Sequence, residues 1–172
     1  QGGCGGLEAL VRPLVQHSLP ATFFVEVMQS LYFGLGPMQR VLERAAASQL
    51  IDFQMHLHPC WRYLAEDNWR QTVAAVKDKH DSMAGLGVHG AKEFLLQGIE
   101  LFAKLTGKAP VAFRSGSLKV DLDLMRAQAE VGIRLSSCVG HAYSPAADPG
   151  LALWSGIERF GAVTEVPVTS YL

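Results

Sequence analysis

The sequence has few cysteines and no excess of charge of either sign. Its 172 residues include three cysteines, Cys4, Cys60 and Cys138, which lie far apart. Three scattered cysteines do not form a disulfide scaffold, and the lack of one is more typical of a cytoplasmic protein than of a secreted one. Fifteen Lys and Arg residues balance sixteen Asp and Glu residues, and no basic block is present. This balance argues against nucleic acid as a partner, because such binding needs basic side chains to neutralise phosphates.

Long apolar runs and a nucleotide-binding motif are also absent from the sequence. No apolar run approaches the roughly 20 residues that a bilayer crossing requires, so no membrane span is predicted. No G-x-G-x-x-G motif follows a predicted strand, since Gly2, Gly3, Gly5 and Gly6 all precede the first one. The sequence therefore argues against a nucleotide-binding Rossmann sheet. Apolar residues are abundant at 49%, which fits a single packed domain spanning residues 1–172.

Predicted strands and helices alternate along the chain. Helical spacing of apolar residues predicts helices, the last one capped by Asp121, at residues 7–15, 38–48, 91–106 and 122–131. Short β-branched and aromatic runs predict strands at residues 21–27, 52–58, 110–114, 133–139 and 163–168. The strand at 21–27 is expected to be buried on both faces, and residues 60–89 are expected to form a long loop with one short helix. This alternation predicts an α/β fold with a parallel sheet and a site at the carboxyl ends of its strands.

The sharpest chemical signal is a pair of histidines near the end of the second predicted strand. The segment Gln54-Met-His56-Leu-His58-Pro59 places both imidazoles on one face, because side chains two apart in a strand point the same way. Neutral imidazole nitrogens are good ligands for zinc. A polar stripe that hydrogen-bonds neighbouring strands would give the same pattern, so spacing alone leaves two interpretations open.

Three segments of the chain, taken in order, resemble the polysaccharide deacetylase (NodB-homology) family. The run Ala21-Thr-Phe-Phe-Val25 is similar to its second strand, and the histidine segment is similar to its metal-binding motif in a His-x-His variant. The run Ala112-Phe-Arg-Ser-Gly116, with the helix after it, is similar to its arginine motif, and Glu165-Val-Pro-Val168 to the strand that follows. The resemblance extends from about residue 7 to residue 172.

This resemblance implies a deformed (β/α) barrel, incomplete in this chain, that removes N-acyl groups from amino sugars or polysaccharides with a divalent metal, zinc being expected. By the same resemblance His56 and His58 are the metal ligands, and Arg114 orients a catalytic carboxylate through a bidentate pair. The expected partner is a carbohydrate or a small N-acylated substrate. The sequence does not predict an oligomeric state.

The chain also departs from the family pattern. The aspartate pair that would supply the catalytic base and a third ligand is expected before Gln1, and the acid histidine is expected beyond Leu172. Ser136 stands near the place of a further family aspartate. Three interpretations of these departures are possible. The chain is a barrel without its first and last strands, a sequence whose true ends lie elsewhere, or a degenerate homologue. A non-catalytic carbohydrate-binding homologue is therefore the alternative function. An amidohydrolase-type barrel is less favoured, because the later strands offer no further strand-end histidine and aspartate.

Other candidate residues carry weaker signals. Trp61 and Trp69 are expected either to stack on a sugar ring or to anchor the long loop. Asp78 and Asp81 could replace the missing carboxylate, although the run Lys77-Asp-Lys-His80-Asp is typical of a solvated surface. Cys60 is expected to point away from the histidines if the strand continues past Pro59.

Overall fold

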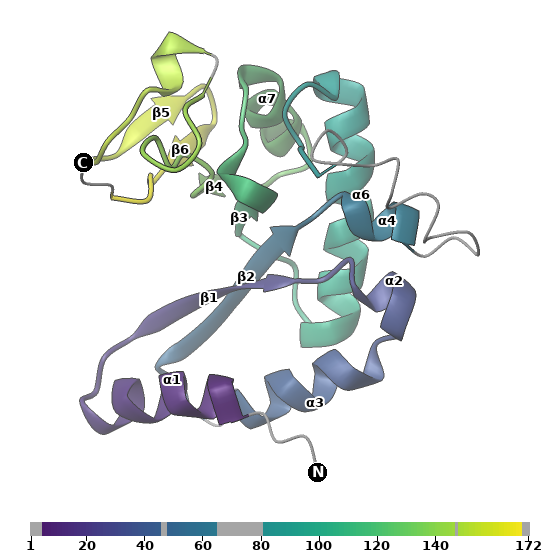
Figure 1. Ribbon diagram of the computed structural model, residues 1–172, viewed down its shortest axis with the longest axis vertical. Helices are drawn as coiled ribbons and strands as arrows, with labels where there is room; N and C mark the ends of the chain where they lie inside the picture. The colour runs from purple at the N-terminus through teal and green to yellow at the C-terminus, as the bar shows by residue number, and fades with distance from the viewer. Residues whose placement is uncertain (1–4, 46–47, 65–80, 147, 170–172) are drawn as a thin grey trace.

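The architecture is a mixed α/β fold built around one open sheet (Figure 1). The computed structural model describes residues 5–45, 48–64, 81–146 and 148–169. Within these residues six strands lie in the order β1-β2-β3-β4-β6-β5. Their bounds are β1 Ala21–Glu26, β2 Ile51–Leu57, β3 Ala112–Ser115, β4 Leu135–Ser136, β5 Glu158–Phe160 and β6 Val163–Glu165. All neighbours are parallel except β5 and β6, and the described strands do not close into a barrel.

Helices connect most of the parallel strands. Their bounds are α1 Gly5–Gln16, α2 Ser30–Phe33, α3 Gly36–Ala45, α4 Cys60–Leu64, α6 Gly87–Thr106 and α7 Leu122–Glu130, with 3-10 turns at Gly116–Leu118 and Pro149–Leu151. The helices α1 and α3 lie side by side, whereas α6 packs against β2, α3 and α7 (Figure 1). None of the helices in the described ranges is long and apolar enough to cross a membrane.

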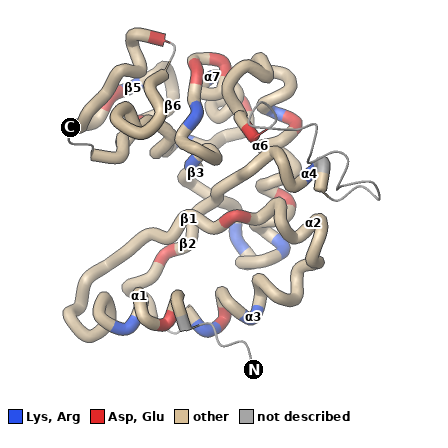
Figure 2. Tube along the Cα trace, viewed as in Figure 1, with Lys and Arg blue, Asp and Glu red and all other residues tan. Residues whose placement is uncertain are grey.

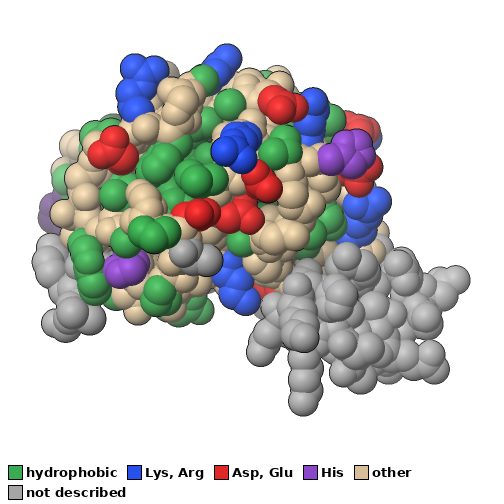
Figure 3. All heavy atoms as spheres, turned by 90° about the horizontal axis from the view of Figure 1, so that it is seen from above, with side chains coloured by type: hydrophobic (Ala, Val, Ile, Leu, Met, Phe, Trp, Pro, Cys, Tyr) green, Lys and Arg blue, Asp and Glu red, His purple; other side chains and the backbone are tan. Residues whose placement is uncertain are grey.

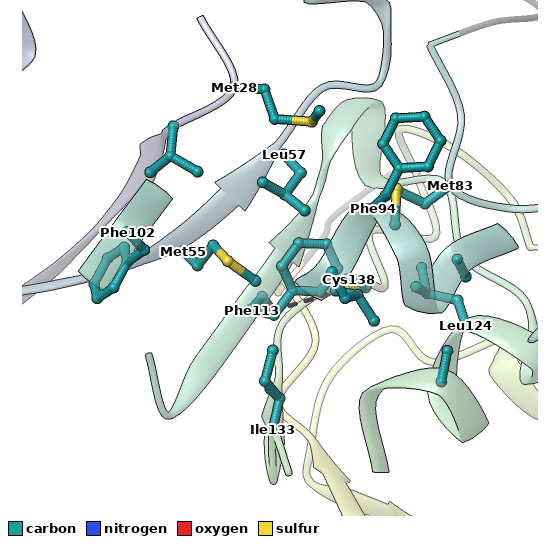
Figure 4. Close-up of a cluster of buried hydrophobic side chains, with 14 of the residues drawn as sticks. Met28, Met55, Leu57, Met83, Phe94, Phe102, Phe113, Leu124, Ile133 and Cys138 are labelled. Carbon is teal, nitrogen blue, oxygen red and sulfur yellow. Dashed lines mark hydrogen bonds between the residues drawn. The ribbon is translucent and has the colours of Figure 1, made fainter. Parts of the chain in front are cut away.

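The two faces of β2 have different chemical character. Phe53, Met55 and Leu57 are buried on one face and belong to the hydrophobic core. Figure 4 shows Met55 and Leu57 in a cluster of buried side chains that includes Phe113 of β3. His56 and His58 alternate with these residues and so project from the opposite face. Within β2 the predicted alternation of Phe53, Met55 and Leu57 with His56 is confirmed, and the ring of His58, just past the end of the strand, lies next to that of His56.

The long elements agree with the sequence better than the short ones. Asp121 caps α7 by accepting a hydrogen bond of 2.8 Å from the Leu124 N–H, as predicted. The strand β1 is not buried on both faces as expected, because it lies at the edge of the described sheet and most of its residues are only half-buried. The strand β4 has two residues, fewer than predicted, and β5 was not predicted. Of the predicted loop 60–89, the part from 65 to 80 lies outside the described residues.

Charged side chains of both signs are interspersed along the trace (Figure 2). From above, hydrophobic side chains share the visible face with acidic and basic ones, and no single charge dominates it (Figure 3).

The pairing of the strands in the sheet positions the candidate site. Glu26 of β1 lies opposite His56 of β2, which lies opposite Arg114 of β3. These residues form one row across three parallel strands at their carboxyl ends.

Candidate metal centre

His56 lies in the middle of this row and is held by the neighbouring strand. Its Nδ1 lies 2.8 Å from the backbone carbonyl oxygen of Arg114. Because a carbonyl only accepts hydrogen bonds, Nδ1 carries the proton and Nε2 keeps a free lone pair. Burial lowers the pKa of His56 to about 4, so the ring is neutral at pH 7. A neutral imidazole with Nε2 unprotonated is the form that binds a metal ion.

His58 is the second imidazole and is held in a comparable way. Its Nδ1 lies 2.7 Å from Oδ2 of Asp81, in the segment that precedes α6. The rings of His56 and His58 have their centres 4.7 Å apart and are nearly perpendicular, at 82°. The hydrogen bond to Asp81 raises the pKa of His58. In both histidines Nδ1 has a protein partner, which leaves each Nε2 available.

Glu26 supplies a carboxylate beside the two imidazoles. Its Oε1 accepts a hydrogen bond of 2.6 Å from the Met28 N–H, whereas its buried Oε2 has no partner among the described residues. Burial raises the pKa of Glu26 to about 7, and the Met28 hydrogen bond only partly offsets this effect. A buried oxygen without a partner is destabilising unless a ligand or solvent satisfies it.

These three side chains form a donor set of the kind that a divalent ion uses. One ligand atom from each of Glu26, His56 and His58 can be chosen so that all three lie within 4.8 Å of one another. Two imidazoles and one carboxylate, with a further position left for water or substrate, are typical of catalytic zinc sites. The buried, unpartnered Oε2 of Glu26 independently indicates that a positively charged or donating group fits here. The described side chains are therefore compatible with a divalent metal, although they do not specify which one.

Arg114 contacts Ser137 and the Phe24 ring. Its Nε donates to the Ser137 carbonyl at 3.1 Å, and its Nη2 donates to Ser137 Oγ at 2.8 Å. The guanidinium also lies over the Phe24 ring, 4.2 Å from its centre. These two hydrogen bonds use Nε and Nη2, and among the described residues no carboxylate forms a bidentate pair with Arg114. The catalytic role of Arg114 stays a prediction.

The aromatic and sulfur candidates have partly structural surroundings. Trp61 is half-buried against the hydrophobic core and makes an edge contact with Phe33, with ring centres 5.7 Å apart. Its role in substrate binding stays a prediction, and Trp69 lies outside the described residues. Burial and the nearby Asp81 carboxylate raise the pKa of Cys60 to about 12, so its thiol stays protonated at neutral pH.

Sequence reasoning missed Glu26 and set Asp81 aside. Glu26 is the one acidic residue in β1 and lies at its carboxyl end. That position was a usable signal, because parallel strands place their carboxyl ends at one edge of the sheet. Asp81 gave no such signal, because its contact with His58 spans 23 residues and depends on the path of the intervening chain.

Comparison with known proteins identifies the fold. The sequence matches no model of a known protein family and no curated protein. The structure is similar to the crystal structure of a "putative polysaccharide deacetylase" from Mycobacterium smegmatis, with a TM-score of 0.60 and 19% sequence identity. The chain has a polysaccharide deacetylase-like fold. The match covers 95% of this chain but 46% of that one, so this chain spans about half the length of its structural neighbour. The fold expectation is thus confirmed, including the open, incomplete barrel.

Proposed function

We propose that this protein is a divalent-metal-dependent hydrolase that removes N-acyl groups from amino-sugar or polysaccharide substrates. The observation that carries the proposal is the convergence of Glu26, His56 and His58 at the carboxyl ends of β1 and β2. The deacetylase-like fold supports the same class of reaction. Zinc is the proposed metal, because imidazole nitrogen and carboxylate oxygen are both among its usual ligands.

The chain's own residues would hold the metal and fix the geometry around it. Nε2 of His56, Nε2 of His58 and Oε2 of Glu26 are the proposed ligand atoms. A bound divalent ion lowers the pKa of a coordinated water and polarises an acyl carbonyl. The hydrogen bond from Nδ1 of His56 to the Arg114 carbonyl keeps that imidazole in the metal-binding tautomer and limits its rotation.

An aromatic surface next to these strand ends is the proposed contact for the sugar. Tyr32 and Phe33 lie on α2, which follows β1, and Trp61 lies on α4, which follows β2. The exposed fractions of Tyr32 and Phe33 are 44% and 56%. Aromatic faces suit the apolar side of a pyranose ring. We therefore propose that Trp61 and its two neighbours bind the substrate.

Zinc titration of the protein by isothermal calorimetry tests the metal site. The wild-type chain is expected to bind one zinc ion. The variants H56A and H58A each remove a proposed ligand. They should lose more zinc affinity than the roughly 10–100-fold that follows when a residue that only hydrogen-bonds a ligand is mutated. H89A is the matched control, since His89 is exposed on α6 and pairs only weakly with Glu93 at 3.5 Å. Wild-type protein that binds no zinc would contradict the proposal.

Acetate release from an N-acetylated oligosaccharide tests the activity. Zinc-loaded protein is expected to release acetate, and chelator-treated protein is not. The specific rival function is a non-catalytic carbohydrate-binding homologue, favoured by Ser136, which stands near the place of a family aspartate. Saturable sugar binding without acetate release, in the presence of zinc, would support this rival function.

A further inference from the structure

Asp81 makes two contacts around His58, one to its imidazole and one to the backbone of Cys60. Its Oδ2 lies 2.7 Å from His58 Nδ1, and its Oδ1 accepts the Cys60 N–H at 3.4 Å. Asp81 and His58 are about equally shielded, with 26% and 29% of their side chains exposed.

A second cation between these groups is the first interpretation to weigh. His58, Cys60 and Asp81 do offer ligand atoms close to one another. However, two atoms that bind one zinc ion at about 2.0–2.2 Å in tetrahedral geometry lie about 3.4 Å apart. The 2.7 Å separation of His58 Nδ1 and Asp81 Oδ2 is too short for an ion between them and is typical of a charge-assisted hydrogen bond. The contact is therefore a hydrogen bond and not half of a metal site.

We propose that Asp81 is a positioning residue that holds His58 in the Nδ1–H tautomer and directs its Nε2 toward Glu26 and His56. This inference rests on the proposed metal site. The carboxylate lies against one edge of the imidazole, and the backbone closes the space beside that edge. A Cβ added to Gly116 would lie 2.7 Å from His58 Nδ1 and 2.8 Å from the Leu57 carbonyl oxygen. Asp81 and the chain at Gly116 thus both lie against the Nδ1 side of the ring.

Only a carboxylate can accept both hydrogen bonds at this place. In an Asp81→Asn variant, one oxygen and one NH₂ group replace the two oxygens. When the amide oxygen accepts the Cys60 N–H, the NH₂ group faces His58 Nδ1 and requires that nitrogen to be an acceptor. The histidine proton then moves to Nε2, and the proposed ligand atom is lost. The reverse orientation keeps the correct tautomer but places the NH₂ group against the Cys60 N–H. The variant is therefore expected to favour the wrong tautomer.

Three variants separate positioning from a merely structural role. D81A removes the carboxylate and lets solvent pair with Nδ1, so it permits the correct tautomer but does not enforce it. D81N enforces the wrong one. We therefore expect zinc affinity to decrease in the order wild type, D81A, D81N, with D81N about 10–100-fold weaker than wild type. D81E, which restores a carboxylate, should recover part of the affinity. A structural role predicts instead that D81N, the closer isostere, is milder than D81A. The matched control is D123N, at an exposed residue on α7.

The decisive readout is the His58 tautomer in metal-free protein, measured from the imidazole ¹⁵N shifts by NMR. Wild type should show Nδ1–H, and D81N should show mainly Nε2–H. Suppose that D81N leaves the tautomer and the zinc affinity unchanged, while H56A still abolishes zinc binding. The proposed role of Asp81 would then be wrong, and the proposed metal site would stand. If wild type bound no zinc, the proposed function would fail, yet the tautomer shift would still establish or overturn the effect of Asp81 on the ring. If D81N does not fold, the tautomer in D81A and D81E decides, because D81A should show a mixture and D81E mainly Nδ1–H.

Discussion

Glu26 is a carboxylate whose surroundings oppose its charge. Most of its side chain is out of solvent, and of its two oxygens only Oε1 accepts a hydrogen bond among the described residues. Burial of this kind disfavours the ionised form and is one reason that titratable groups at functional sites have displaced pKa values. The folded protein without metal is therefore less stable than it would be with a neutral group at this position.

The unfavourable burial of Glu26 predicts that the stability of the folded protein depends on pH, and that a single substitution removes this dependence. The pKa of Glu26 rises from 4.5 to about 7 on folding. Between these values the unfolded chain releases a proton that the folded chain keeps, so stability decreases as pH rises, by up to about 3 kcal/mol. E26Q should lack this decrease and should be more stable than wild type at pH 8, but not at pH 4. Urea unfolding in chelator across this range measures it.

The control for this experiment is E93Q, at a carboxylate more than half exposed on α6. It should follow the wild-type pH dependence. The interpretation of Glu26 would be wrong if E26Q and wild type lost stability in parallel between pH 4.5 and 7.

The histidine pair could be predicted because its geometry is local. Alternation along β2 alone places His56 and His58 on one face. Glu26 and Asp81 join them through strand pairing and through a contact 23 residues away in sequence. Neither relation leaves a periodic trace in a single sequence, so these carboxylates could not be assigned to the site with the same assurance.

The contact between α6 and β2 supports the strand that carries both imidazoles. Gly98 of α6 faces the buried side of β2, where an added Cβ would lie 2.6 Å from one methyl of Leu57 and 3.0 Å from the Met55 sulfur. The helix can approach the sheet this closely because residue 98 has no side chain. The position of the helix, and with it the back of the site strand, depends on that contact.

Substitution of this glycine should destabilise the protein although alanine favours helices. G98A is expected to lower the free energy of unfolding by about 1–3 kcal/mol, because extra volume in a packed core forces neighbours to shift. E93A, on the exposed side of the same helix, should change it by less than about 0.5 kcal/mol. Chemical denaturation of the two variants provides the measurement. Equal or greater stability of G98A would show that Leu57 and Met55 adjust without strain.

Long elements could be predicted from the sequence, and short strands could not. The helix α6 spans 20 residues with apolar residues at helical spacing, so its pattern is clear, and the prediction missed only its first turn. The strands β4 and β5 have two and three residues. Their limits depend on hydrogen bonds to neighbouring strands rather than on their own side chains. For example, the Ser137 N–H continues the bonding of β4 toward β3 by donating to the Phe113 carbonyl at 2.9 Å.

At the scale of the whole molecule, metal binding should appear as added stability. A ligand that binds only the folded state stabilises it by about 2.7 kcal/mol at a concentration 100 times its Kd. For a chain of 172 residues this corresponds to a rise in Tm of about 5–10 °C. Differential scanning fluorimetry with and without zinc should show this rise in wild type. H58A, tested at the same zinc concentration, should show little or none, and an equal rise in H58A would place the metal elsewhere.

The fold class followed from the order of elements, and the family resemblance added the expectation of an incomplete barrel. Alternating strands and helices predict a parallel sheet, and the described chain has one with a single antiparallel pair at its edge. The arrangement β1-β2-β3 then places the three site strands next to one another. At 19% identity, the likeness to a solved structure shows this architecture alone.

The row formed by Glu26, His56 and Arg114 makes the site a reporter of correct assembly. If β1 paired one step out of place along β2, Val25 or Val27 would stand beside His56, and every side chain of β1 would change faces. A molecule misassembled in this way would keep its helices and nearly all of its circular dichroism. It would nevertheless have lost the proposed acidic ligand, so zinc uptake is expected to distinguish native chains from near-native ones where helix content does not.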